Sequence, residues 1–116
     1  MTKTDLYTIA HSAYIRNRYT DGEHRLNRCQ AWYYEDFDLQ AVALVSYRTL
    51  VAVYWHGVVW EFGRWSSTTT QHVRKFARFM NAPVVSLYRC SCMSKRDYAK
   101  HDICGWADMI DVFANV

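Results

Sequence analysis

Residues 41–62 read AVALVSYRTLVAVYWHGVVWEF, and they show the clearest β-strand pattern in the chain. Short apolar runs rich in valine and aromatic residues, bounded by turn residues, are typical of strands joined by hairpins. Gly57 separates two of these runs and supplies a residue that can turn tightly. The segment therefore predicts an antiparallel meander of three strands, at residues 41–47, 50–56 and 58–62.

Two further runs flank this meander. Residues 29–34 are rich in aromatic side chains and predict a strand that leads into the acidic turn Glu35-Asp36-Phe37-Asp38. Residues 84–89 predict another strand, close to the cysteines near the end of the chain. Residues 16–28 are polar and charged, so they predict a loop.

Three segments have the apolar spacing of helices. Residues 2–14 carry an apolar stripe, and residues 70–80 follow a hydroxyl-rich cap at residues 66–70. A last helix is expected near the end of the chain, with Trp106 and Phe113 on its apolar face. Together the elements predict an α+β fold in one domain, residues 1–116, with an antiparallel sheet of four to five strands and two to three helices packed against it.

Composition limits the class of protein. The chain has 116 residues, of which 51% are hydrophobic and 16% aromatic, and its net charge is +3. A chain of this length can bury one core, and a mild positive charge permits an acidic partner without requiring nucleic acid. The sequence shows no signal peptide and no apolar run long enough to span a bilayer, so we expect a cytoplasmic protein that does not bind membranes.

The cysteines predict a structural zinc site. Cytoplasmic thiols stay reduced, so clustered cysteines there indicate metal binding before disulfides. Two thiols at C-x-C spacing and a His/Cys pair at H-x-x-C spacing can hold one Zn²⁺ in a closed tetrahedral site. Cys29 could replace the histidine as the fourth ligand, and separate buried thiols or a redox role are the alternatives. The predicted ligands are Cys90, Cys92, His101 and Cys104.

A resemblance covers about a third of the chain. Residues 46–52 read SYRTLVA, and residues 65–76 read WSSTTTQHVRKF. This pair resembles an uncharacterised domain of small phage and plasmid proteins, with the pattern S-Y-x-T-x-V-A followed by aromatic-S-x-T-T-x-x-H-x-x-x-F. The resemblance implies a mobile-element origin and an accessory role, and such accessory domains include anti-CRISPR proteins. It implies no catalytic residues and does not extend to the cysteines.

Polar and aromatic side chains offer further candidates. The hydroxyls at residues 66–70 lie next to His72, and we expect them to cap the helix and His72 to be buried and hydrogen-bonded, with no catalytic role. Arg74, Lys75 and Arg78 are expected on the solvent face of the same helix. Alternation along the strands predicts that about half of the sheet's aromatic side chains pack in the core and the rest form a protein-binding patch. These aromatics are Trp32, Tyr33, Tyr34, Tyr54, Trp55, Trp60 and Trp65.

Together these features predict a binding protein and no enzyme. The sequence contains no phosphate-binding glycine loop, no H-E-x-x-H and no G-x-S-x-G. We expect an accessory protein of phage or mobile-element type that binds and sterically inhibits a host defence protein, in particular an RNA-guided CRISPR nuclease. A nucleic-acid-binding accessory protein is the alternative, and the chain is expected to be a monomer or homodimer.

Overall fold

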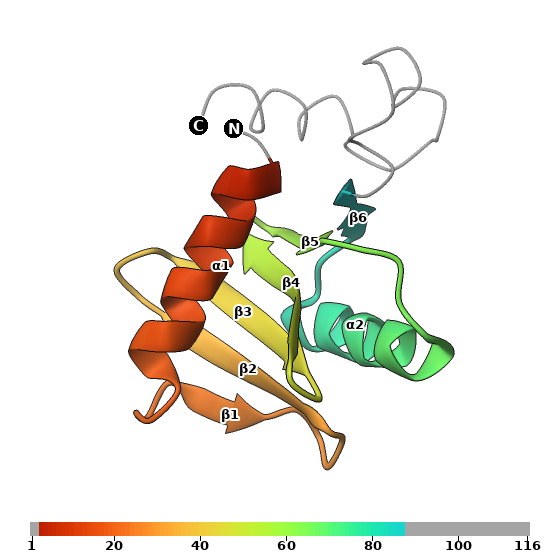
Figure 1. Ribbon diagram of the computed structural model, residues 1–116, viewed down its shortest axis with the longest axis horizontal. Helices are drawn as coiled ribbons and strands as arrows, with labels where there is room; N and C mark the ends of the chain where they lie inside the picture. Colours follow the sequence, from red (N-terminus) through yellow and green to blue (C-terminus); the bar gives the residue numbers. More distant parts are fainter. Residues whose placement is uncertain (1–2, 88–116) are drawn as a thin grey trace.

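The computed structural model describes residues 3–87, which form two helices and six strands (Figure 1). Elements predicted from the apolar patterns are all present within this range, with ends that differ by up to three residues. In chain order they are α1 (Lys3–Asn17), β1 (Glu23–Arg25), β2 (Ala31–Asp36), β3 (Ala41–Ser46), β4 (Thr49–Trp55), β5 (Val58–Glu61), α2 (Ser67–Met80) and β6 (Val84–Ser86). The helix expected near residues 106–113 lies outside the described residues.

The six strands form one mixed sheet, in the order β1-β2-β3-β4-β5-β6. Strands β1 to β5 pair antiparallel, and β6 pairs parallel with β5. The α+β class is confirmed, but the prediction of four to five antiparallel strands was wrong. Because α2 follows β5 and carries the chain across the sheet, β6 enters it in the same direction as β5.

The additional strand, β1, lies in the segment predicted to be a loop. It has only three residues, Glu23–Arg25, and none of them is apolar. It pairs with β2 through His24 and Tyr33, which are opposite each other. The predicted acidic turn is also shifted, since Glu35 and Asp36 are still part of β2. Pairing with a neighbour therefore extended the sheet where the local sequence lacked a strand pattern.

Tight turns connect the central strands. His56 and Gly57 join β4 to β5, and both have positive φ values, 52° and 77°. Two consecutive positive φ values are those of a type I′ hairpin, whose twist matches that of the strands. Tyr47 and Arg48 join β3 to β4, and Tyr47 has a φ of 57°, which is uncommon for an aromatic residue. The turn predicted at Gly57 is confirmed.

The two helices cover opposite faces of the sheet, which gives three layers (Figure 1). Leu6, Ala10 and Ala13 of α1 pack on one face, as the apolar stripe predicted. Val73 and Phe76 of α2 pack on the other. Because both faces are covered, the central strands are apolar on both sides, which explains the nearly continuous apolar runs in the sequence.

A β-bulge in β4 sets which side chains face α2. The pairing changes from Leu44 with Ala52 to Val45 with Leu50, so Val51 is the extra residue. Val51 and Ala52 therefore both pack in the cluster under α2, and Leu50 faces α1. Ser46 alternates with Leu44 along β3, which places it on the α2 side of the sheet.

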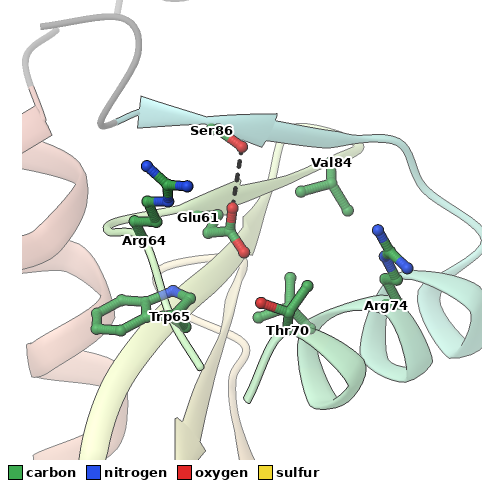
Figure 2. Close-up of a pocket in the computed structure, with 8 residues that line it drawn as sticks. Glu61, Arg64, Trp65, Thr70, Arg74, Val84 and Ser86 are labelled. Atoms are coloured by element: carbon green, nitrogen blue, oxygen red, sulfur yellow. Dashed lines mark hydrogen bonds between the residues drawn. The ribbon is translucent and has the colours of Figure 1, made fainter. Parts of the chain in front are cut away.

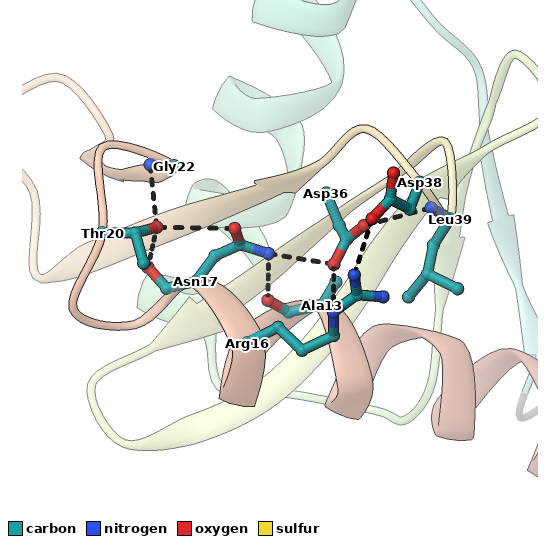
Figure 3. A network of polar contacts seen from close by, with 8 residues as sticks. All are labelled: Ala13, Arg16, Asn17, Thr20, Gly22, Asp36, Asp38 and Leu39. Atoms are coloured by element: carbon teal, nitrogen blue, oxygen red, sulfur yellow. Dashed lines mark hydrogen bonds and ion pairs between the residues drawn. The ribbon is translucent and has the colours of Figure 1, made fainter.

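A polar network fastens the end of α1 to the turn after β2 (Figure 3). The buried carboxylate of Asp36 accepts a hydrogen bond from Asn17 Nδ2 at 3.1 Å and one from the backbone N–H of Leu39 at 3.0 Å. Arg16 bridges the two acids: its Nε lies 3.3 Å from Asp36 Oδ2, and its Nη2 lies 2.8 Å from Asp38 Oδ2. The last turn of α1 is thereby held against the sheet.

Candidate functional site

A buried polar cluster joins the end of β3 to the first turns of α2. The hydroxyl of Ser46 lies 2.8 Å from His72 Nδ1 and 3.1 Å from the hydroxyl of Thr69. Ser46 is 2% exposed and His72 is 5% exposed. The ring of Tyr47 packs against the His72 ring at a tilt of 43°, with a centroid distance of 5.7 Å. These buried side chains serve as hydrogen-bond partners for one another, which buried polar groups need because no water reaches them.

Burial also sets the charge state of this cluster. Desolvation lowers the pKa of His72, and the nearby Lys75 cation lowers it further. The imidazole is therefore neutral at pH 7. The expectation of a capped helix and a buried, hydrogen-bonded His72 is confirmed, since Ser66 accepts a hydrogen bond from the N–H of Thr69 at the start of α2.

The cluster also unites the two halves of the sequence pattern described above. Ser46 and Tyr47 come from the first half, while Thr69 and His72 come from the second. The turn at Tyr47 and the start of α2 are far apart in the chain, so spacing along the sequence gave no sign that they meet. Their contact gives the pattern a structural role, because these residues lock α2 onto β3.

A cavity of about 370 Å³ lies on the other side of α2, between this helix and strands β5 and β6 (Figure 2). Glu61 is the last residue of β5 and Ser86 is the last residue of β6. The Ser86 hydroxyl donates to the Glu61 carboxylate at 2.9 Å. In open sheets, ligands bind just beyond the carboxyl ends of parallel strands, which is where this cavity lies. It is lined by Glu61, Arg64, Trp65, Thr70, Val73, Arg74, Val84 and Ser86.

The cavity combines charge, hydrogen-bonding groups and an apolar wall. The side chains of Arg64 and Arg74 are exposed and flank the buried Glu61 (Figure 2). Within residues 3–87, the indole N–H of Trp65 is a buried side-chain donor without a hydrogen-bond partner. The expected exposure of Arg74 is confirmed, and Trp65 was expected among the sheet aromatics. Glu61 and Arg64 were not predicted as site residues. The parallel β5–α2–β6 connection was the signal that could have found them.

The sheet aromatics are less exposed than predicted. Trp55, Trp60 and Tyr34 are buried, which agrees with the expectation that about half pack in the core. The other four are partly buried where exposure was expected, because helices cover both faces of the sheet. A smaller aromatic surface remains beside α2. Phe79 of α2 is 59% exposed, its ring centroid lies 5.2 Å from that of Tyr33, and Tyr33 stacks on His24 at 5.1 Å.

This surface also carries a cation. The ammonium of Lys75, one turn before Phe79 on α2, donates to Cys29 Sγ at 3.4 Å. We call His24, Tyr33, Lys75 and Phe79 the Tyr33–Phe79 surface. It combines exposed aromatic area with positive charge, which is the composition of many macromolecular binding surfaces.

The predicted zinc ligands Cys90, Cys92, His101 and Cys104 lie outside the described residues. The alternative ligand, Cys29, is a free and partly buried thiol in the connection between β1 and β2. Between residues 3 and 87, no group of three His, Cys, Asp or Glu side chains is placed to hold a metal ion. The zinc site therefore stays a prediction from the sequence.

Comparisons with known proteins identify one family. No helix in the described part of the chain is both long and apolar enough to cross a bilayer. Neither a curated protein nor a solved structure matches the chain. A family model matches residues 4–90, which include α1 from its second residue, α2, the six described strands, the Ser46–His72 cluster and the residues that line the cavity. The chain belongs to DUF8033, a family of unknown function.

Proposed function

We propose that this chain is a non-enzymatic binding protein that contacts another macromolecule through the Tyr33–Phe79 surface. As the sequence suggested, we take the partner to be a host defence protein, an RNA-guided CRISPR nuclease, and the mechanism to be steric inhibition by a phage or mobile-element accessory protein. One observation carries the proposal. Phe79 stays 59% exposed although its ring contacts, at a tilt, the Tyr33 ring that stacks on His24.

Two physical arguments support binding over catalysis. Aromatic side chains fixed by neighbours lose little conformational entropy when a partner covers them, so they are efficient binding residues. Lys75 and the adjacent Arg78 on α2 add positive charge, which favours an acidic partner surface. In contrast, Ser46, whose hydroxyl contacts His72, is only 2% exposed, so a substrate would have to displace packed side chains to reach it.

The experiment compares two exposed phenylalanines. Phe79→Ala removes the outermost ring of the Tyr33–Phe79 surface, and Phe37→Ala removes a ring that is 85% exposed in the turn after β2. Purified protein is mixed with purified RNA-guided CRISPR nuclease, and co-elution and DNA cleavage are measured. We expect the wild type and Phe37→Ala to co-elute and inhibit cleavage, while Phe79→Ala weakens binding by about tenfold or more.

Salt dependence separates the partner classes. A protein interface dominated by aromatic contacts should keep its affinity between about 50 and 200 mM salt, whereas binding to nucleic acid should fall steeply because counterions are released. Nucleic-acid binding remains the alternative, since stacked aromatics beside a lysine also suit exposed bases. Absence of nuclease binding, with salt-sensitive binding to single-stranded oligonucleotides, would establish that alternative.

A further inference from the structure

The short strand β1 forms an edge of the sheet. It comes first in the strand order and, among the described strands, pairs only with β2, so it is the lowest strand of the sheet in Figure 1. The two helices make their main contacts with β2, β3 and β4, further into the sheet. An edge strand of this kind offers backbone N–H and C=O groups to a further strand.

The hydrogen bonds to β2 show which backbone groups of β1 face outward. The Gly22 carbonyl accepts a hydrogen bond from β2 at 2.9 Å, and the Leu26 N–H donates to the first residue of β2 at 2.9 Å. Because the bonding direction alternates along a strand, the backbone groups of Glu23 and Arg25 point away from β2. The Glu23 N–H donates to the Thr20 carbonyl at 3.1 Å, so the Arg25 N–H is the donor that β1 can offer to another strand.

Charge favours one strand as the partner of this edge, which is β1 of a second copy. The strand reads Glu23-His24-Arg25. In an antiparallel pair with its two-fold axis at His24, Glu23 of each copy lies directly opposite Arg25 of the other. The two neighbouring symmetric registers place glutamate opposite glutamate or arginine opposite arginine, and like charges directly opposite each other are destabilising. The register centred on His24 is therefore the one in which the charges are complementary.

Both charged side chains are already held in place on the α1 side of the sheet. Glu23 lies opposite Tyr34, whose hydroxyl donates to the Glu23 carboxylate, and Arg25 lies opposite Trp32. The Arg25 Nε donates to the Cys29 carbonyl at 2.9 Å. A carboxylate accepts several hydrogen bonds and a guanidinium has five N–H donors, so each group can take an additional partner. Side chains that are ordered beforehand lose little entropy when they pair.

We propose that two copies of this chain form a dimer by pairing their β1 strands antiparallel about His24, which joins two six-stranded sheets into one. The Arg25 N–H of each copy donates to the Glu23 carbonyl of the other, and the two-fold axis repeats every contact. The pairing segment has three residues, so the interface is small and the dimer dissociates readily.

The pairing also affects the Tyr33–Phe79 surface. His24 stacks on Tyr33 and therefore lies on the α2 side of the sheet. Residues directly opposite each other in antiparallel strands have their side chains on the same face, so the two His24 rings are neighbours in the dimer. Two Tyr33–Phe79 surfaces then lie side by side on one face. A role of this doubled surface in partner binding rests on the proposed function, whereas the pairing of β1 does not.

Sedimentation equilibrium of the full chain, with a reducing agent present, tests the proposal from micromolar to millimolar protein. We expect the dimer fraction of the wild type to rise with concentration. Glu23→Arg and Arg25→Glu each place like charges opposite one another at two positions, and should weaken self-association by about tenfold or more. Arg74→Glu is the matched control and should dimerise like the wild type, because it reverses an exposed arginine beside β5 and β6, at the other end of the strand order.

A mixture of the two charge-reversal variants gives a result that folding defects do not imitate. Glu23→Arg is basic at both outer positions of β1 and Arg25→Glu is acidic at both, so the charges are complementary only in a heterodimer. We expect the mixture to associate at least as tightly as the wild type, although each variant alone is monomeric.

Two further variants complete the experiment. Arg25→Pro removes the outward N–H but no hydrogen bond to β2, so it should abolish self-association. Phe79→Ala disrupts the proposed binding surface and should still dimerise, which separates this proposal from the proposed function. The proposal is overturned if the wild type is monomeric at millimolar concentration, if the charge-reversal variants dimerise alone like the wild type, or if their mixture does not associate.

Discussion

Ser46 Oγ and His72 Nδ1 lie 2.8 Å apart although 26 positions separate the two residues in the chain. Ser46 ends β3, and His72 lies in the second turn of α2, so this contact ties the helix to the centre of the sheet. It also completes a group of three hydrogen-bonded side chains with Thr69. A buried group of this kind is stable only while each member keeps its partner.

Removing the central hydroxyl should therefore be costly. Ser46→Ala leaves Thr69 Oγ1 and His72 Nδ1 buried without their partner, and we expect the free energy of unfolding to fall by about 1–3 kcal/mol. Urea denaturation followed by tryptophan fluorescence measures this loss. Ser67→Ala changes an exposed serine at the start of α2 and should have less than half the effect. Equal losses in the two variants would contradict a stabilising role for the buried cluster.

His72 should make stability depend on pH. Its folded-state pKa is lowered below the ordinary value of 6.5 by desolvation and, to a lesser extent, by Lys75, so the unfolded chain binds a proton more readily than the folded chain. The contribution of neutral His72 to the free energy of unfolding is fully present above pH 6.5. It is lost as the pH falls from there toward the lowered folded-state pKa. Melting temperatures between pH 8 and 5 should fall more steeply for the wild type than for His72→Asn. Parallel curves would show that His72 does not titrate in this way.

The two carboxylates that share Arg16 should differ in their contribution to stability. The side chain of Asp36 is 3% exposed and that of Asp38 is 81% exposed. Asp36→Ala removes an acceptor for Asn17 and for the backbone N–H of Leu39, and should cost about 2–3 kcal/mol. Asp38→Ala breaks only a solvated ion pair and should cost less than about 1 kcal/mol. Chemical denaturation of both variants checks the order, and a larger loss for Asp38→Ala would be incompatible with it.

Zinc removal tests the prediction made from the cysteines. Elemental analysis of the purified protein should find about one zinc per chain, and a chelator should lower the melting temperature, because ligation contributes folding energy on the order of 10 kcal/mol in small zinc domains. Cys92→Ser should lower both the zinc content and the melting temperature. Cys29→Ser is the control, and it should retain zinc if His101 is the fourth ligand. Metal-free protein of unchanged stability would refute the site.

Local sequence patterns predicted most of the helices and strands, because the spacing of apolar residues in each element reflects which of its side chains are buried. The alternating and continuous apolar runs identified β2 to β6, and the stripe Leu6, Ala10 and Ala13 identified α1. The charged strand Glu23–Arg25 could not be recognised, because only its pairing with β2 makes it a strand. The direction of β6 was mispredicted although the helix between two strands indicated a parallel crossover.

The candidate sites were harder to predict because they are made by contacts distant in sequence. The burial of His72 could be predicted from its position in a capped helix. Its hydrogen-bond partner, Ser46, could not be predicted from the sequence. Glu61, Arg64 and Ser86 meet only because α2 returns the chain beside β5. Exposure of the aromatics was overestimated because the sequence did not reveal that helices cover both faces.

Thr69 and Thr70 are neighbours on α2 but contribute to different sites. The Thr69 hydroxyl is hydrogen-bonded to the buried Ser46, and Thr70 lines the cavity. Any molecule that pushes on this turn from the cavity side also acts on the imidazole of His72, two positions after Thr70, because Thr69 and His72 are both hydrogen-bonded to Ser46. The His72 ring protons thus act as a built-in spectroscopic reporter, able to register occupancy without a label attached to the protein.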